Sequence, residues 1–295
     1  MNIVVIADEN YASQSAATLI SFLENNRNER HDIYYITTGI SEQSRLNIEG
    51  LCKKNNAFFH YILFEEKALS PYDGIGHWSK YTFMKLFIPQ LLPDEVKKVL
   101  YLDVDMLILD SLEEVYNIVL GDNALAGVED VPNNKSCCKR CGLGINSVYV
   151  NSGFMLMNLS AWRKEWDANS FNRFVDDHRE KMTINDQDVI NSVFEGRIVP
   201  LEWRYNVTSF FFGLSSAIWK HYPRTMYKKA RRKPAVIHFT NSNKPWKDSC
   251  VHLYAKKWRS ALNRTSFGKV EYKSSVKIAL KLCVYEIVDF FRIWL

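Results

Sequence analysis

Short apolar runs and segments of helical period alternate over the first hundred or so residues of the chain. The apolar runs are 2–7, 32–39, 57–64 and 97–103. The segments with helical spacing between them are 16–26, 41–54 and 79–92. Strands that are apolar throughout and alternate with helices predict a parallel sheet with helices on both faces.

The alternation continues in the second half of the chain. Further strands are predicted at 123–130, 148–159 and 235–240, and further helices at about 169–181 and 187–195. No internal repeat and no linker rich in Gly, Ser or Pro interrupts the sequence. We therefore expect one α/β domain over residues 1–250 and a separate tail over 251–295.

Polar residues stand where several of these strands end. Asp8, Asp103, Asp130 and His238 each fall at or near the end of a predicted strand. In open α/β sheets, ligands bind outside the carboxyl ends of the strands. The four residues therefore mark a candidate binding site.

Asp103 and Asp105 follow the apolar run "VLYL" one residue apart. In extended backbone, residues i and i+2 point to the same side, so the two carboxylates repel each other unless a cation lies between them. Carboxylate oxygens favour Mg²⁺ or Mn²⁺, and an added imidazole favours Mn²⁺. The alternative is that the pair merely ends a strand, with Asp105 or Asp110 capping a helix that starts near Ser111.

Three later stretches bear on this choice. Gly153 in "VNSGF" indicates that another group approaches the backbone closely. Asp186 opens a helical segment, where it is either the N-cap or part of a site. His238 and Lys244 share one loop, which is typical of a metal ligand followed by a phosphate contact.

Basic residues are concentrated in two places. The chain has a net charge of +5, yet residues 254–295 hold nine Lys/Arg against three Asp/Glu, and 220–233 hold seven Lys/Arg and no acid. These blocks indicate an anionic partner, whether phosphate, nucleic acid or an acidic membrane, or else a solvated basic surface.

Cysteine usage and the N-terminus bear on the compartment. Cys137, Cys138 and Cys141 are clustered, and they are either half of a zinc site or, as we expect, reduced thiols in a loop. The N-terminus shows neither a basic leader nor a long apolar core, so no secretory signal is predicted. A cytoplasmic protein is expected.

Four motifs together resemble those of glycosyltransferase family 8, in order and in spacing. They are "YLDVD" (101–105), "VNSGFMLMNLSAWR" (150–163), "NDQDVIN" (185–191) and "IHFTNSNKPW" (237–246). The opening "MNIVVIADENYA" is also similar. The strongest resemblance is to bacterial lipopolysaccharide and lipooligosaccharide α-galactosyl- and α-glucosyltransferases, over about residues 1–250.

The resemblance implies a GT-A fold, a single Rossmann-like mixed sheet flanked by helices, and a UDP-sugar donor, UDP-galactose or UDP-glucose, bound with Mn²⁺. Asp103, Asp105 and His238 match the metal ligands, with Val104 beside them among the cofactor-binding residues. Asp8, Asn10 and Tyr11 match positions that hold uracil and ribose, and Lys244 matches the residue that holds the diphosphate. The positions that match the donor-sugar pocket are Asp130, Asn151, Asp186 and Gln187.

Two positions depart from the family pattern. Lys85 stands where most members have Arg, and it keeps the charge without the bidentate fork. Asn241 stands where Gly is frequent, and Asn is the next most tolerant residue for left-handed backbone.

The implied reaction is the transfer of a hexose with retained configuration onto a bacterial cell-surface glycan. Retention by double displacement requires a nucleophile, for which Gln187, Asp130 and Asp186 are the candidates. A front-face route, in which the leaving phosphate helps to deprotonate the acceptor, fits better because an amide is a poor nucleophile. The alternatives are a non-catalytic nucleotide-sugar-binding module and a phosphatase of the haloacid dehalogenase type.

The partners follow from the loops and the tail. Acceptor contacts are expected from loops 64–78 and 131–147, and a nucleic-acid partner is not expected. In 275–295, Lys277, Lys281, Tyr285, Asp289 and Arg292 form a polar stripe within an apolar helix. This pattern predicts an interfacial helix on the inner face of the plasma membrane. The alternative is a helix packed on the domain or on a second subunit of a homodimer.

Overall fold

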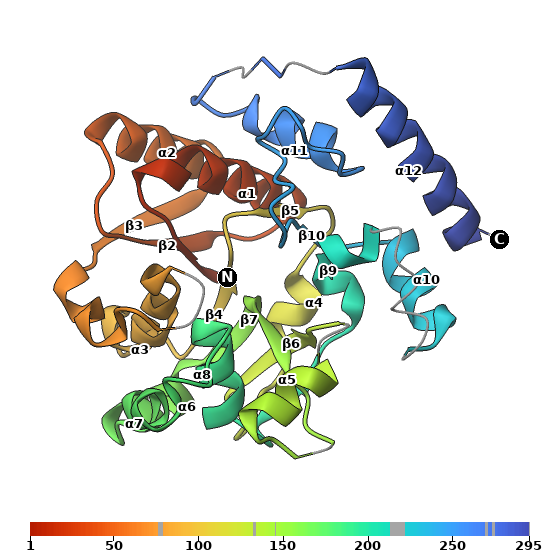
Figure 1. Cartoon of the computed structure of the whole chain (residues 1–295). Coiled ribbons are helices and arrows are strands. Elements are labelled where there is room, and N and C mark those ends of the chain that lie inside the picture. The colour runs from red at the N-terminus through yellow and green to blue at the C-terminus, as the bar shows by residue number, and fades with distance from the viewer. Residues whose placement is uncertain are drawn as a thin grey trace.

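The computed structural model describes the chain except residues 76–78, 132–133, 145, 213–221, 269–270, 273–274 and 295, and the side chains of 292–294. A seven-stranded mixed sheet forms the centre, with strand order β3-β2-β1-β4-β7-β6-β8. A three-stranded sheet of order β5-β10-β9 lies next to it (Figure 1).

The strands of the central sheet are β1 (Asn2–Ile6), β2 (His31–Thr37), β3 (Ala57–Leu63), β4 (Lys98–Leu102), β6 (Leu125–Glu129), β7 (Val150–Asn158) and β8 (Ile198–Pro200). Those of the small sheet are β5 (Met106–Ile108), β9 (Val207–Thr208) and β10 (Val236–His238). The first six helices are α1 (Ala12–Asn25), α2 (Glu42–Lys54), α3 (Ile88–Leu91), α4 (Glu113–Tyr116), α5 (Asn134–Cys141) and α6 (Leu159–Asp167). The later helices are α7 (Ser170–His178), α8 (Asn185–Val193), α10 (Arg224–Arg232), α11 (Ala255–Leu262) and α12 (Val276–Trp294).

The parallel half of the sheet follows from its apolar strands. β1 pairs in parallel with β2 and β4, and β2 with β3. Ile3 and Val5 pack with α1 and α2 on one face, whereas Val4 belongs to the core that α6, α7 and α8 cover on the other face. Both faces are therefore buried, and the predicted parallel arrangement is confirmed for these strands.

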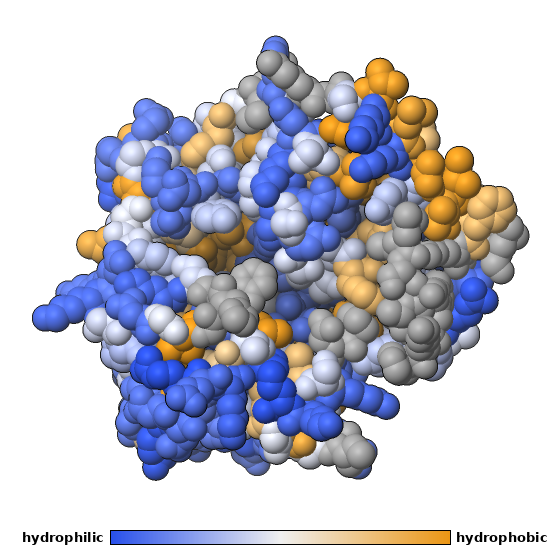
Figure 2. Space-filling model, viewed as in Figure 1, coloured by the Kyte–Doolittle hydropathy of each residue, from blue (hydrophilic) through white to orange (hydrophobic). Residues whose placement is uncertain are grey.

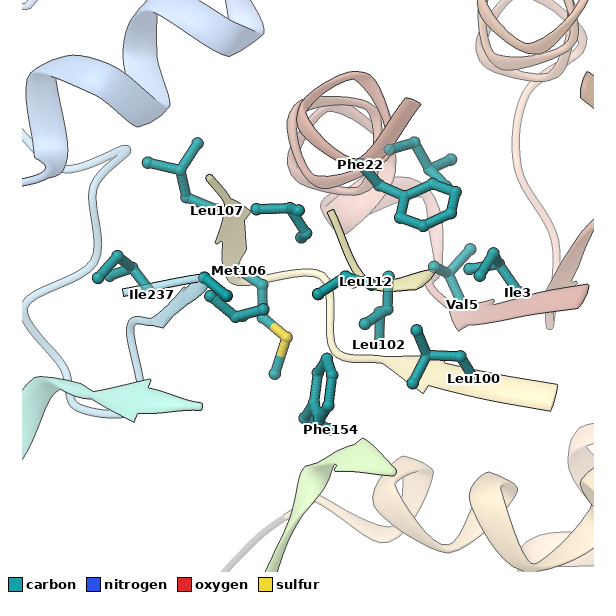
Figure 3. Close-up of a cluster of buried hydrophobic side chains, with 14 of the residues drawn as sticks. Ile3, Val5, Phe22, Leu100, Leu102, Met106, Leu107, Leu112, Phe154 and Ile237 are labelled. Carbon is teal, nitrogen blue, oxygen red and sulfur yellow. The ribbon is translucent and has the colours of Figure 1, made fainter. Parts of the chain in front are cut away.

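The other half of the sheet is mixed, because β7 runs antiparallel to both β4 and β6. The small second sheet was not evident in the sequence pattern. In it β10 lies antiparallel to β5, so that His238 stands opposite Met106. Buried side chains from both sheets and from α1 meet in one core (Figure 3). This shared core fixes the small sheet against the carboxyl end of β4.

The helix predicted at 79–92 is divided into a 3₁₀ helix, Lys80–Phe87, and the short helix α3. Pro89 lies in the first turn of α3, where its missing N–H costs nothing. Within one continuous helix the same proline would remove a hydrogen bond and clash with the preceding turn.

The two C-terminal helices differ in burial. Trp258 of α11 is fully buried, in the same core as α1. In contrast, α12 carries six apolar side chains that are at least half exposed: Val276, Leu280, Val284, Ile287, Phe290 and Phe291. They form an apolar stripe along α12, at the upper right in Figure 2. Among the described residues, no helix has the length and apolar character needed to cross a bilayer.

Candidate active site

Two carboxylates and one imidazole converge where β4 and β10 end. His238 Nε2 lies 3.1 Å from Asp105 Oδ1 and 3.6 Å from Asp103 Oδ2. One ligand atom from each of the three side chains lies within 4.8 Å of the other two. The structure thus brings together the three residues that the sequence predicts as metal ligands, although 135 positions separate Asp103 from His238 in the chain.

The remaining carboxylate oxygens face hydrogen-bond donors. Asp103 Oδ1 accepts from the Tyr101 hydroxyl at 2.7 Å and lies 3.3 Å from Lys85 Nζ. Asp105 Oδ2 accepts from Lys244 Nζ at 2.6 Å. Burial on its own would raise the pKa of Asp105, but the charges of His238 and Lys244 hold it well below its usual range. Asp105 is therefore an anion at neutral pH.

The side-chain amide of Asn206 orients the imidazole of His238. His238 Nδ1 lies 3.0 Å from Asn206 Oδ1, and Asn206 Nδ2 donates to Asn151 Oδ1 at 2.9 Å. With Nδ1 donating to Asn206 Oδ1, Nε2 would be the ring nitrogen available to a cation held with the aspartates. Two carboxylate oxygens and a neutral imidazole nitrogen are a donor set that suits Mn²⁺. Sequence reasoning missed Asn206, which carries no local signal for this role.

Gly153 makes room for this arrangement. A Cβ atom at position 153 would lie 2.4 Å from His238 Cε1 and 2.6 Å from Asp103 Oδ2. Any side chain there would push apart two of the three candidate ligands. The close approach predicted from the glycine is the approach of the site's own side chains.

Lys85 is buried, with a side chain 8% exposed, and links two segments of the site. Its Nζ lies 3.0 Å from Asp186 Oδ2 and donates to Ser152 Oγ at 3.3 Å, in addition to its contact with Asp103. Burial alone would lower the pKa of Lys85, but the two carboxylates hold it above its usual value. The N-cap of α8 is Ile184, so the interpretation of Asp186 as an N-cap is wrong: its carboxylate faces Lys85.

Gln187 is held at both ends of its amide. Its Nε2 donates to Asp130 Oδ2 at 2.9 Å, and its Oε1 accepts from Asn151 Nδ2 at 3.1 Å and from the Ser152 amide at 3.0 Å. Burial raises the pKa of Asp130, against the effect of the Gln187 hydrogen bond. Asp130 and Asn151 are thus joined through Gln187, and Asp186 is paired with Lys85. Ser152 connects the two sets, because its amide donates to Gln187 and its hydroxyl accepts from Lys85.

Asp188 is a further anion that the sequence analysis did not single out. It accepts from both Nη atoms of Arg140, from the Tyr149 hydroxyl, and from the amides of Thr183 and Ile184. Burial would raise the pKa of Asp188, but these donors lower it overall. The ion pair between Arg140 and Asp188 connects α5 to the first turn of α8, where Gln187 is the neighbouring residue in the chain.

A cleft of about 250 Å³ opens beside the aspartates. The expected cofactor-binding residues that line it are Asp8, Tyr11, Lys85, Asp103, Val104, Asp105 and Lys244. Trp246, which stands in the last of the four motifs, also lines the cleft and packs edge-on against Tyr11 at 6.1 Å. The site therefore offers an aromatic pair on one side and charged groups on the other.

Two expected cofactor-binding residues do not line this cleft. Asn10 donates to Asp8 Oδ2 at 3.2 Å and is exposed, so it acts on the cleft through Asp8. Asn241 accepts from the Asn243 amide at 2.9 Å. Non-glycine residues with positive φ in the described chain are Asn56 and Asn169, so Asn241 does not need the left-handed backbone that the family's Gly had suggested.

The cysteine cluster holds free thiols, but they lie on helix α5, so the expectation that they stand in a loop is wrong. Burial raises the pKa of Cys137, Cys138 and Cys141, to about 12 for Cys141. In the part of the chain that is described, the one group of side chains with metal-ligand geometry is that of Asp103, Asp105 and His238. The zinc interpretation thus finds no support.

The mixed α/β sheet carries a cleft at the ends of its strands, beside two carboxylates and an imidazole that form a candidate cation site. These features indicate an α/β protein that binds a ligand at this edge. The model of "Glycosyl transferase family 8" matches residues 2–250. The chain belongs to this family, and it is a glycosyltransferase with a C-terminal helix beyond the matched region. The match favours sugar transfer over the phosphatase alternative.

Curated relatives agree over nearly the whole length. General stress protein A of Bacillus subtilis (strain 168) is 24% identical over 274 residues, covering 92% of this chain and 96% of that protein. A lipopolysaccharide 1,2-glucosyltransferase of Escherichia coli is 26% identical over 278 residues, covering 92% of this chain and 80% of that protein.

Solved structures share the fold. Galactosyltransferase LgtC, in complex with donor and acceptor sugar analogs, superposes with a TM-score of 0.78 at 24% identity, covering 96% of this chain and 100% of that chain. The glycosyltransferase GlyE of Streptococcus pneumoniae TIGR4 gives a TM-score of 0.65 at 21% identity, covering 97% and 63%. The predicted GT-A fold is confirmed.

Proposed function

We propose that the protein transfers glucose or galactose from a UDP-sugar to a hydroxyl of a bacterial cell-surface glycan, with Mn²⁺ and with retained anomeric configuration. The observation that carries the proposal is the meeting of Asp103, Asp105 and His238 beside a cleft. A divalent cation on these residues would neutralise the charge that develops on the departing diphosphate.

Other side chains of the cleft would each bind a different part of the UDP-sugar. Asp8 and Tyr11 stand after β1, where they would take the uridine, with Asn10 orienting Asp8. Lys244 already contacts Asp105, so its ammonium group is placed to add positive charge near the diphosphate. Lys85, which lines the cleft, forms an ion pair with Asp186 at 3.0 Å.

A front-face reaction is the better candidate for retention. Gln187 Oε1 accepts two hydrogen bonds, from Asn151 and from the Ser152 amide, which hold it in place and reduce its weak nucleophilicity further. Asp186 is neutralised by Lys85, and burial raises the pKa of Asp130. Each of these environments weakens the case for a covalent intermediate.

We further propose a cytoplasmic enzyme attached to the inner face of the plasma membrane, with catalytic residues 1–250 and a C-terminal membrane-binding segment. Lys277 and Lys281 flank the exposed apolar stripe of α12, a combination that suits an acidic lipid surface. Since α11 packs on α1, attachment is assigned to α12.

The test is UDP release from UDP-glucose and UDP-galactose with and without Mn²⁺, with NMR assignment of the product anomer. Asp105→Ala should abolish Mn²⁺-dependent release, by at least about 100-fold, and leave the circular dichroism spectrum unchanged. Asp122→Ala, which removes an exposed acid in a turn, is the matched control. Full activity of Asp105→Ala, or an inverted product, would contradict the proposal.

A further inference from the structure

A second and larger cavity lies between α5 and α10, beyond the edge strand β8. Its volume is about 1050 Å³, and none of the residues that line it lines the donor cleft. Part of its wall lies within 131–147, the segment expected to contact the acceptor as a loop; Asn134–Cys141 of it is helix α5 instead, and residues 132, 133 and 145 lie outside the described part. The equally expected loop 64–78 does not contribute to this cavity.

The cavity combines apolar walls with a basic rim. Leu143, Val148, Leu201, Trp203 and Met226 supply apolar surface. Lys135 and Lys139 are exposed on α5 one helical turn apart, and neither forms an ion pair with any described residue. Lys229 on the opposite rim is already paired with Glu202 at 2.6 Å. Lys135 also interacts electrostatically with Glu129, an acid in the wall of the same cavity. The two ammonium groups above an apolar wall complement an amphiphile that carries a negative charge.

This cavity shares two supporting elements, β6 and α5, with the reaction centre. Glu129 lines it, held by the Tyr222 hydroxyl at 3.0 Å, and the next residue in the chain is Asp130, the partner of Gln187. The helix that bears Lys135 and Lys139 also carries Arg140, which pairs with Asp188 beside Gln187. A molecule in the cavity would therefore rest on the same two elements, β6 and α5, that hold partners of the donor-sugar residues.

We infer that the cavity binds the non-reacting part of the acceptor, and that this part carries a phosphate group joined to an apolar moiety. The inference rests on the proposed function and names its acceptor class: a phosphorylated, amphiphilic glycan. Lysine binds phosphate as a point charge. The cβ separation of about 5–6 Å between helical residues i and i+4 lets both ammonium groups reach one phosphate. The apolar wall then accommodates the adjoining hydrocarbon.

The experiment compares four soluble acceptors that are built on the same oligosaccharide. They differ in whether they carry a phosphate group and in whether they carry an octyl chain. The phosphate should raise kcat/KM about tenfold or more, and the octyl chain should raise it further. Lys135→Gln combined with Lys139→Gln should remove the phosphate-dependent gain while leaving UDP-sugar hydrolysis without acceptor unchanged. The matched control is Lys53→Gln with Lys54→Gln, two exposed lysines on α2 that lie outside this cavity.

A second variant tests the apolar wall independently. Met226→Trp fills the rim from an exposed position, 45% accessible, and should reduce the octyl-dependent gain while sparing the phosphate-dependent one. Calorimetric titration of the four acceptors gives the same comparison without turnover. Comparing the phosphorylated oligosaccharide with its octyl phosphate form separates a soluble phosphorylated glycan from a lipid-linked one.

Two failures are distinguishable. If wild-type protein hydrolyses UDP-hexose with Mn²⁺ but does not discriminate among the four acceptors, the cavity inference is overturned and the proposed function survives. The same holds if the lysine variant loses donor hydrolysis as strongly as transfer, since the role of the lysines is then structural. If no UDP-hexose is hydrolysed at all, the proposed function itself fails.

Discussion

Two buried cations, Lys85 and Arg231, show how differently this chain supports charge. Lys85 is 6% exposed and contacts two carboxylates and a hydroxyl, all from motif segments of the active site. Arg231 is 3% exposed and has one carboxylate partner, Asp289 of α12, and lies over the Phe212 ring at 3.8 Å. Its Nε and Nη1 atoms have no hydrogen-bond partner among the residues that the structure describes.

The difference lies in what supplies the counter-charge. The partners of Lys85 belong to the packed centre of the domain, so its charge is compensated whenever the domain is folded. The partner of Arg231 belongs to a helix that leaves most of its apolar side chains exposed. The Arg231–Asp289 ion pair therefore links α12 to α10, and its loss would leave a buried charge unpaired, which costs several kcal/mol.

The largest expected losses of activity and stability come from removing Lys85, the cation with more partners. Lys85→Ala leaves Asp186 buried without a counter-charge, and we expect activity to fall about 100- to 1000-fold and the free energy of unfolding to fall by about 3–5 kcal/mol. Steady-state UDP release and urea unfolding measure the two effects. Lys85→Arg, which keeps the charge, should retain most of the stability; equal losses in both variants would show that volume and not charge matters.

A smaller loss is expected at the second cation. Asp289→Ala leaves Arg231 uncompensated and should lower the free energy of unfolding by about 2–4 kcal/mol, while the Mn²⁺-dependent KM for UDP-sugar stays within about twofold. Glu286→Ala, at an exposed position on the same helix, is the control. The double variant Arg231→Met with Asp289→Leu should recover most of the loss. Additive losses in the double variant would contradict an ion-pair role.

The smallest effect at neutral pH concerns His252, next to Arg231. Burial, and then the charge of Arg231, lower the pKa of His252 to about 3. The unfolded chain binds this proton near pH 6.5 and the folded chain does not, so stability is full above pH 6.5 and falls as the pH drops toward 3.

His252→Phe should remove that contribution to the slope, up to about 1.4 kcal/mol per pH unit. Urea unfolding of wild type and variant between pH 4 and pH 7 measures the difference. His178→Phe, at a half-buried position on α7, is the matched control. An unchanged slope in His252→Phe would show that the buried imidazole is protonated in the folded protein.

The sequence predicted the active-site side of this comparison much better than the tail side. The parallel strands and the strand-end residues Asp103 and His238 carry local signals, since apolar runs and polar ends are visible in the sequence itself. The small second sheet was not predictable, because β5 and β9 are three and two residues long and make sense only once β10 lies between them. Asn206 directly precedes β9, and its contact with His238 depends on the pairing of β9 with β10, so it was not predictable either.

Side-chain pairing across long sequence separations was equally out of reach. Asp188 reads as an ordinary acid in the first turn of a helix until α5 places Arg140 beside it. Asp289 was assigned to a polar stripe with Lys277 and Lys281, and the structure turns it toward Arg231, 58 residues earlier in the chain. The side chain of Arg292, from the same stripe, lies outside the described part.

Gly153 gives a simple test for other chains of this architecture. Since even a methyl group at this position would collide with the imidazole and one carboxylate, a relative with any larger residue there must either shift the strand or abandon the three-ligand arrangement. The residue at that single position therefore separates the relatives that can place two carboxylates and an imidazole around one cation from those that cannot, before any of them is purified.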